Sequence, residues 1–325
     1  MSATAWFFVI RLLQTIPVVF AIAALNFLLL QMAPGDAADV IVGLAGHGSA
    51  EAADELRRTY GLDKPLIEQF FIYIGHLIRL DLGVSIIQGR PVIELISERL
   101  GATLILMLTS IVIAIVVGVL LGIFASLRHR TMSDTVLTVL ALVVYATPQF
   151  WLGLMLIVFF SITLDILPSG GMRSIGVELG PAASFLDIAR HLVLPALTLG
   201  LFYVAVYTRL MRTSMLDVMT FDYITTARAK GASEIRTAFV HAARNALLPI
   251  VTLVGVQVGH LLGGSILVET VFGWPGLGRL VLDALLQRDL NLLLGILFIS
   301  SIVVVATNLL VDLIYGILDP RLVHK

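Results

Sequence analysis

Apolar residues are concentrated in six long stretches that carry no Asp, Glu, Lys or Arg. The stretches are 24, 28, 30, 18, 24 and 22 residues long, and no other uncharged stretch exceeds 11 residues. A helix needs about 20 mostly apolar residues to cross the hydrocarbon layer of a bilayer. We therefore predict six membrane spans, over residues 12–35, 100–127, 135–164, 191–208, 245–268 and 290–311.

Composition supports this class. The mean hydropathy is +1.00, and 58% of residues are hydrophobic while 13% are charged, which is far from a soluble domain. Buried core helices of a large soluble protein are the rival interpretation, but such helices carry a polar stripe. In the first stretch, Ala21-Ile22-Ala23 is similar to a signal cleavage site, yet the apolar run continues past the length of a signal peptide. We predict an uncleaved first span and an all-α polytopic membrane protein.

The distribution of positive charge predicts which side each loop occupies. An even number of spans places both termini on one side, together with 128–134 and 209–244, and these segments hold 11 Lys/Arg in 68 residues. The opposite loops hold 10 in 111 residues, and 6 of the 10 lie in 36–99, which is long enough to escape the positive-inside rule. We therefore place both termini and the 209–245 loop in the cytoplasm.

The exterior segment 36–99, between the N-terminal span region 1–35 and the core 100–318, has helical patterns of its own. Ser49 can cap a helix through Tyr60 that Gly61 ends, Asp63-Lys64-Pro65 can open a second helix, and Arg90-Pro91 can open a third that runs into the second span. These patterns favour a cap that lies flat on the bilayer. Docking of a soluble receptor is also compatible with them.

Proline and glycine predict bends and close packing. Pro17, Pro148 and Pro195 lie inside or at the ends of spans, where each can bend a helix. Glycines repeat at four-residue spacing at 255, 259 and 263, which predicts close helix packing, and packing against a second subunit fits this pattern. The same spacing occurs only once at 118 and 122, so that signal is weaker. In 269–289, four residues predict a tight surface turn before a helix to Gln287: Gly273, Pro275, Gly276 and Gly278.

The spans contain no charged side chain that could couple transport to an ion gradient. Gln257, His260 and Asn308 are candidates for a translocation path or for helix contacts, and packing is the better interpretation of the lone His260. A phosphate-binding Walker loop needs Gly before its Lys, and Asp63, Ala229 and His324 precede the three Lys residues. The chain also has no Cys and no metal-ligand motif, so we expect no catalytic site and no cofactor.

A helix, tight turn and helix are predicted in the loop 209–245. Tyr223–Lys230 has good helix formers and ends at Gly231, a natural residue after a helix end, and Ser233 can cap a following helix to Leu247. Alanines keep the turn narrow enough to enter a groove on a partner. The alternative is an amphipathic elbow on anionic lipid headgroups, and the residues alone leave both open. The candidate coupling residues are Ala227, Arg228, Ala229, Lys230, Gly231, Ala232 and Ser233.

Thr226–Ile250 resembles the conserved cytoplasmic loop of ABC-importer membrane subunits, with its Ala pair, Gly231 and Leu248-Pro249. Where that loop generally begins Glu-Ala-Ala, this chain has Thr225-Thr226-Ala227. Further motifs, in order along nearly the whole chain, resemble the dipeptide, oligopeptide and nickel permease branch: Ala33–Asp36, Tyr60–Leu66, Asp81–Ser85, Phe272–Leu280 and Asp319–Arg321.

The resemblance implies a type I ABC importer permease fold with six transmembrane helices, an exterior helical loop after the first, and a cytoplasmic tail at 319–325. It implies the inner membrane of a bacterium and a pore formed with a second permease, in the expected case a heterodimer. It also implies two ATP-binding subunits that carry ATP and Mg and receive the Ala227–Ser233 turn, and an extracytoplasmic solute-binding protein. No nucleic-acid partner is implied.

Three classes of function stay in view. The favoured one is the pore-forming subunit of an ATP-driven, binding-protein-dependent importer, with di- or oligopeptides as the default substrate of the branch. Nickel, glutathione-like and sugar-derived solutes are open, as is a homodimeric pore. A self-contained secondary transporter is the alternative. A membrane-embedded enzyme or scaffold would need catalytic groups at one depth, and the sequence offers none.

Overall fold

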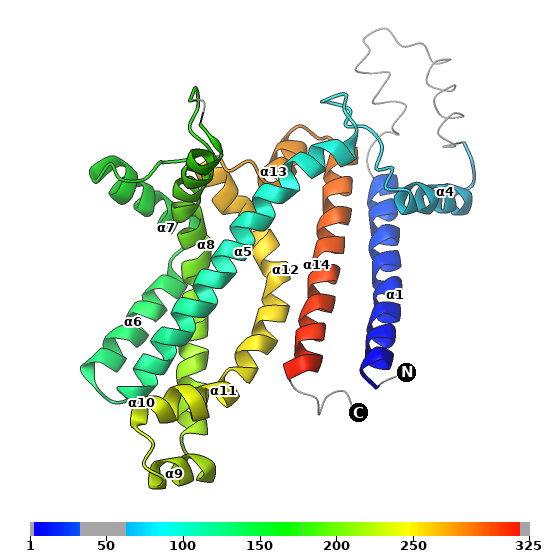
Figure 1. The fold of residues 1–325 in the computed structure, drawn as a ribbon. Helices are drawn as coiled ribbons and strands as arrows, with labels where there is room; N and C mark the ends of the chain where they lie inside the picture. The colour runs from blue at the N-terminus through cyan, green and yellow to red at the C-terminus, as the bar shows by residue number, and fades with distance from the viewer. Residues whose placement is uncertain (1–2, 33–62, 178, 319–325) are drawn as a thin grey trace. The chain divides into compact units, whose positions relative to one another are not determined.

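The computed structural model describes residues 3–32, 63–177 and 179–318, and the elements within these ranges are almost entirely helical (Figure 1). The chain divides into two compact units, 1–100 with 280–325, and 101–279. The predicted helix at Ser49–Tyr60 and the motifs at Ala33–Asp36 and Asp319–Arg321 lie outside the described residues.

The first unit is built on two long antiparallel helices, α1 (Ala3–Met32) and α14 (Leu290–Leu318), so the start of α1 and the end of α14 lie at one end of the unit (Figure 1). The short helix α4 (Leu66–Ile78) packs near the other end of α1, and α5 (Val92–Leu127) begins in this unit. As predicted, α4 follows Lys64-Pro65 and α5 follows Pro91. Asp289 is buried, accepts a hydrogen bond from Ser85 Oγ, and caps α14 by accepting from Leu292 N.

The second unit surrounds α8 (Pro181–Val218), 67% of whose most apolar stretch is buried. Side chains of α8 such as Leu199, Tyr207 and Met211 lie in one buried cluster with Trp274. The other helices of the unit are the rest of α5, α6 (Met132–Ala146), α7 (Gln149–Leu156), the π-helical η1 (Ile157–Thr163), α9 (Asp222–Ala229), α10 (Glu234–Arg236), the π-helical η2 (Thr237–Ala242), α11 (Ala243–Ala246), α12 (Leu248–Phe272) and the start of α13 (Leu277–Leu286).

The long apolar stretch 135–164 is not one straight span. Its helices Met132–Ala146 and Gln149–Thr163 meet at 107°, at Thr147-Pro148, where proline cannot donate a helical hydrogen bond. Pro17 and Pro195 lie inside unbroken helices. Four described helices are long and apolar enough to cross a membrane, or up to seven segments if each bent pair counts as one span. The all-α polytopic fold is confirmed, and the count of six spans stays a prediction within that range.

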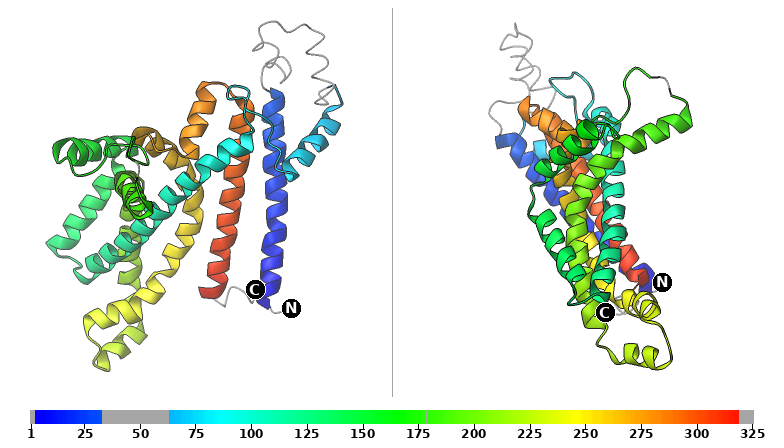
Figure 2. Two further views of the ribbon diagram at one scale, coloured as in Figure 1. Left: turned by 45° about the horizontal axis from the view of Figure 1, so that its top comes forward. Right: turned by 90° about the vertical axis from the view of Figure 1, so that its left-hand side faces the viewer.

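Within the second unit, loops predicted to share a side do lie together. Figure 2 shows the α5–α6 connection at the same end of the unit as the α9–α11 segment, and the α12–α13 turn at the opposite end. Helix α8 continues through Arg209 and Arg212 to Val218, so the first part of the 209–245 loop is helix rather than a separate segment. The predicted span 191–208, which ends at the charged residue Arg209, is therefore shorter than α8.

The turn after α12 contradicts the prediction of a surface turn. The turn is tight, with Gly273 at a φ of +60° ending α12, but the Trp274 side chain is fully buried and its Nε1 donates to Ala102 O at 2.9 Å. Glu269, which we placed at the edge of a loop, is inside α12 and is also fully buried. Glu269 and Trp274 are thus part of the core of the second unit.

Candidate functional site

The predicted coupling residues form one exposed elbow between α9 and α10. After α9 ends, Gly231 takes a φ of +85°, a left-handed conformation that favours glycine. Gly231 N donates to Arg228 O at 2.9 Å and Ala232 N donates to Ala227 O at 3.2 Å. These two bonds make a Schellman motif, which satisfies the last carbonyl groups of the helix. The predicted glycine-ended helix is therefore confirmed.

Ser233 begins the second arm of the elbow. Its Oγ accepts a hydrogen bond from Arg236 N at 3.3 Å, which is the N-cap interaction that its sequence position predicted. Arg228 closes the turn by donating from Nε to Glu234 Oε1 at 2.9 Å and from Nη2 to Glu234 Oε2 at 3.1 Å. Because this ion pair is exposed, it contributes at most about 1 kcal/mol to the stability of the turn.

The elbow is anchored at its base and open at its tip. Ile224 and Ala238 are fully buried in the core of the second unit, and Asn245 Nδ2 donates to Tyr223 Oη at 2.7 Å across the two arms. At the tip, Ala227 and Ala232 are half-buried, and the other five predicted residues are exposed: Arg228, Ala229, Lys230, Gly231 and Ser233. A rigid protrusion of this kind can transmit a push on its tip to α8 and α12.

Two contributions to this surface were not predicted. Ile235, beside the turn, has 69% of its surface exposed, and such an apolar residue on a charged protrusion is suited to contact a partner. The Tyr223–Asn245 hydrogen bond joins residues 22 positions apart, and no local pattern in the sequence signals it. The sequence does signal the exposure of Ile235, because this apolar residue stands between the charged residues Glu234 and Arg236.

The three candidate path residues lie on α12 and α14, which belong to different units. Gln257 lies on α12, and its Oε1 is buried without a hydrogen-bond partner among the described residues. Asn308 is exposed on α14, in the other unit. His260 lies within α12, but its side chain is outside the described part of the structure. The described residues contain no group of three or more potential metal ligands.

Comparison with known proteins decides the family. Residues 118–324 match the model of the binding-protein-dependent transport system inner membrane component, and residues 5–107 match the N-terminal model of the same kind of component. The chain belongs to this family. The ABC-importer permease family that the motifs predicted is therefore confirmed, and the chain is a membrane component of a transport system.

Named relatives of this permease cover almost its whole length. The dipeptide transport system permease protein DppB of Escherichia coli K12 is 40% identical, over 97% of this chain and 98% of its own. The oligopeptide transport system permease protein AppB of Bacillus subtilis is 38% identical, over 96% and 97%. The glutathione transport system permease protein GsiC of Escherichia coli O6:H1 is 39% identical, over 97% and 98%. The permease thus resembles proteins named for short peptides and for glutathione.

Proposed function

We propose that this permease forms half of the pore of an ATP-driven importer of di- or oligopeptides. Relatives named for dipeptide, oligopeptide and glutathione transport, each aligned over almost the full chain, support a short peptide as the substrate class. In this proposal a second, related permease forms the other half of the pore. A solute-binding protein delivers the peptide from outside, and two ATP-binding subunits hold ATP and Mg in the cytoplasm of a bacterial cell.

The observation that carries the coupling role is the geometry of the Ala227–Ser233 turn. Both arms of the turn have satisfied backbone ends, its base is buried, and its tip is exposed. ATP binding closes the two ATP-binding subunits, whose grooves push on the turn of each permease. The push moves α8 and α12 and opens the pore outward, and hydrolysis reverses the movement. In this scheme the permease has no catalytic residue of its own.

Crosslinking tests the docking directly. The chain has no Cys, so Ala229→Cys gives this subunit a single thiol, at the tip of the turn. In the assembled transporter, a short crosslinker that attaches to this thiol and carries a photoactivated group at its other end needs no Cys on the partner, and we expect it to link position 229 to an ATP-binding subunit. Ile175→Cys is the matched control, because Ile175 is 99% exposed in the loop before α8, at the other end of the same unit (Figure 1). A link from position 175 to that subunit, or none from 229, would contradict the docking model.

Uptake by proteoliposomes tests the transport class. We expect labelled dipeptide to accumulate only when both permeases, the ATP-binding subunits, the binding protein and ATP are present. Uptake by this chain alone, driven by an ion gradient without ATP, would instead establish the alternative of a secondary transporter. Competition by unlabelled tripeptide, glutathione and Ni²⁺ then assigns the substrate class within the branch.

A further inference from the structure

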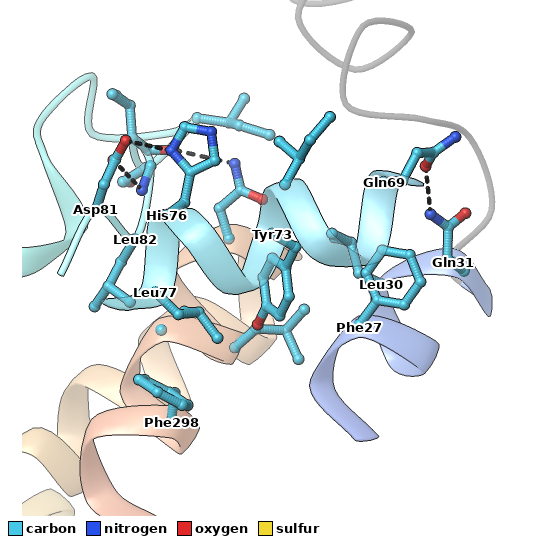
Figure 3. A pocket seen from close by; sticks show the side chains of 18 of the residues that line it. Phe27, Leu30, Gln31, Gln69, Tyr73, His76, Leu77, Asp81, Leu82 and Phe298 are labelled. Atoms are coloured by element: carbon cyan, nitrogen blue, oxygen red, sulfur yellow. Dashed lines mark hydrogen bonds and ion pairs between the residues drawn. The ribbon is translucent and has the colours of Figure 1, made fainter. Parts of the chain in front are cut away.

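The first unit contains a cavity of about 730 Å³ that the transport role does not explain (Figure 3). It lies between α1, α4, α14 and the 81–89 segment that follows α4. Ligand pockets in proteins have volumes of roughly 300–1,000 Å³, so a small organic molecule or part of a lipid fits. All of its described lining belongs to this one unit.

The walls of the cavity are apolar and come from three helices. Phe27 and Leu30 of α1, Leu77 of α4, and Phe298 of α14 face it, and Tyr73 extends from α4 into the space between α1 and α14 (Figure 3). Helix α1 is a candidate span, and its neighbouring Leu29 is exposed on the outer surface. In a bilayer, this arrangement places the apolar walls within reach of lipid hydrocarbon.

The position of α4 sets the depth of the cavity. Helix α4 follows the end of the α1 span and carries exposed apolar side chains on one side, which is typical of a helix that lies in the membrane interface. Those exposed side chains are Leu66, Ile67, Phe71 and Ile78. The cavity therefore extends from the interfacial level of α4 down along the apolar faces of α1 and α14.

One end of the cavity holds a carboxylate that is hydrogen-bonded to an imidazole. Asp81 Oδ2 lies 2.8 Å from His76 Nδ1, and Asp81 Oδ1 accepts from Gly83 N at 3.1 Å (Figure 3). The hydrogen bond with His76 lowers the pKa of Asp81, so the carboxyl group is ionised at neutral pH. A carboxylate offers about four acceptor positions, of which two are used here. The Asp81 side chain is 56% exposed and can accept another donor.

The charge of the lining selects the class of ligand. Among the described residues that line the cavity there is no Lys or Arg, and Asp81 is the one carboxylate. Uncharged amides complete the polar rim, with Gln31 bonded to Gln69 at 2.8 Å and Asn291 Nδ2 bonded to Val84 O at 3.3 Å. An Asn side chain has two amide hydrogens, so the second can serve a phosphodiester oxygen. Asp81 thus offers an acceptor for a cationic head group, and the lining offers no Lys or Arg to a purely anionic one.

We propose that this cavity binds one membrane phospholipid whose head group ends in a protonated primary amine. The ammonium group lies at Asp81, the phosphodiester lies at the amide rim beside Asn291, and the upper part of one acyl chain packs between Phe27 and Phe298. The bound lipid fills the space between α1, α4 and α14. This inference does not depend on which solute the transporter carries, so it stands or falls separately from the proposed function.

Lipid retention tests the proposal. The full-length chain is placed in nanodiscs made of equal amounts of phosphatidylethanolamine and phosphatidylglycerol. It is then released into mild detergent, and native mass spectrometry counts the lipids that stay bound to it. We expect one retained phosphatidylethanolamine per chain in preference to phosphatidylglycerol. Asp81→Asn keeps the shape of the side chain and is expected to reduce that preference roughly fivefold, the effect of one exposed ion pair. Asp63→Asn, at an exposed carboxylate outside the cavity, is expected to change nothing.

A steric variant provides the second measurement. Leu30→Trp places an indole in the cavity and is expected to abolish the retained lipid, whereas Leu29→Trp, at the adjacent exposed position, is expected to keep it. If Leu30→Trp does not fold, the Asp81 and Asp63 pair still decides. Equal or greater retention of phosphatidylglycerol by the wild-type chain, no retained lipid, or an unchanged preference in Asp81→Asn would each overturn the proposal.

Discussion

Arg212 of α8 holds the buried carboxylate of Asp134 at the start of α6 with two hydrogen bonds, from Nε to Oδ1 at 2.6 Å and from Nη2 to Oδ2 at 2.8 Å. Arg130 N also donates to Asp134 Oδ2, at 3.1 Å. The pair therefore fixes the α5–α6 connection to α8, six residues before α8 ends at Val218 and the chain enters the coupling elbow. The ion pair thus ties the start of α6 to the part of α8 that leads into the elbow.

Removing Arg212 should destabilise the fold more than removing Asp134. The Asp134 side chain is 6% exposed and that of Arg212 is 24% exposed. Arg212→Ala leaves a buried carboxylate without its partner, and we expect it to lower the free energy of unfolding by about 3–5 kcal/mol. Asp134→Ala leaves a guanidinium that can reach water, so we expect a loss nearer 1 kcal/mol. Denaturant titration of the purified chain measures both.

Two further variants complete this test. Replacing both partners by apolar residues, Arg212→Met with Asp134→Leu, should recover most of the stability lost in Arg212→Ala, because no buried charge is left alone. Arg209→Ala, at the exposed arginine one turn earlier over the Tyr145 ring, should cost less than about 1 kcal/mol. Equal losses for Arg212→Ala and Arg209→Ala would show that the ion pair does not stabilise the fold.

A second buried network of hydrogen bonds lies in the same unit and gives the next prediction. Thr103 Oγ1 donates to Glu269 Oε1 at 2.8 Å and accepts from Leu277 N at 2.7 Å, while Glu269 Oε2 accepts from Arg279 N at 2.9 Å. Thr103→Val keeps the shape but leaves buried donors and acceptors unpaired. Two groups, Leu277 N and Glu269 Oε1, lose this partner, and each unsatisfied group costs about 1–3 kcal/mol, so we expect a total loss of about 2–6 kcal/mol.

Thr103→Ser is the matched control for this loss. It keeps the hydroxyl that joins Leu277 and Glu269 and removes one methyl group, so we expect a loss of about 1 kcal/mol or less. Comparing the unfolding midpoints of the two variants separates the hydrogen bonds from packing. If Thr103→Ser were as unstable as Thr103→Val, the methyl group rather than the hydroxyl would be the stabilising feature.

Local signals in the sequence were sufficient for four helix ends. Lys64-Pro65 before α4, Pro91 before α5, Gly231 after α9 and Ser233 before α10 all mark ends that the structure has, because capping depends on residues within one turn. The tip of the elbow was predictable for the same reason. The burial of Ile224 at the base of the elbow was not predictable, because it depends on which distant helices pack against this residue.

Long-range pairs account for what the sequence did not reveal. Glu269 marked the end of an uncharged stretch, and a carboxylate there indicates a loop unless a partner is known. That partner, Thr103, is 166 residues away, and the buried Trp274 contacts Ala102 across a similar separation. A single sequence gives no measure of such pairing, so the α12–α13 turn was expected at the surface.

The coupling turn itself gives a prediction about backbone strain. Gly231 has a φ of +85° and nothing within 4 Å of where a Cβ would lie, so a substitution is strained by conformation and not by contact. We expect Gly231→Val to insert normally in the membrane but to lose association with the ATP-binding subunits and ATP-dependent uptake, because a branched side chain disfavours this φ by about 1–2 kcal/mol. Co-purification of the subunits and uptake assays measure the two losses.

Gly231→Asn distinguishes conformation from size at this position. Asn tolerates the left-handed region better than other non-glycine residues, so the turn keeps its shape while the side chain grows. We expect Gly231→Asn to retain most of the association that Gly231→Val loses. Equal losses in the two variants would indicate that the partner groove excludes any side chain at this position, and full activity of Gly231→Val would contradict the coupling role.

Glycine spacing gives the last prediction, because the weaker of the two sequence signals, at 118 and 122, marks a close contact between two helices. A Cβ at Gly122 on α5 would lie 2.5 Å from Met211 Cβ and 2.8 Å from Thr208 O on α8, whereas one at Gly263 on α12 would meet nothing within 4 Å. We expect Gly122→Ala to separate α5 from α8 and to lower the free energy of unfolding by about 1–3 kcal/mol. Gly263→Ala should change the free energy of unfolding of the isolated chain by less than about 0.5 kcal/mol.

The effect of Gly263→Ala in the assembled transporter is a separate measurement: weaker association with the second permease there would place Gly263 in the contact between subunits. A larger loss for Gly263→Ala than for Gly122→Ala in the isolated chain would contradict the stabilising role of the close contact between α5 and α8.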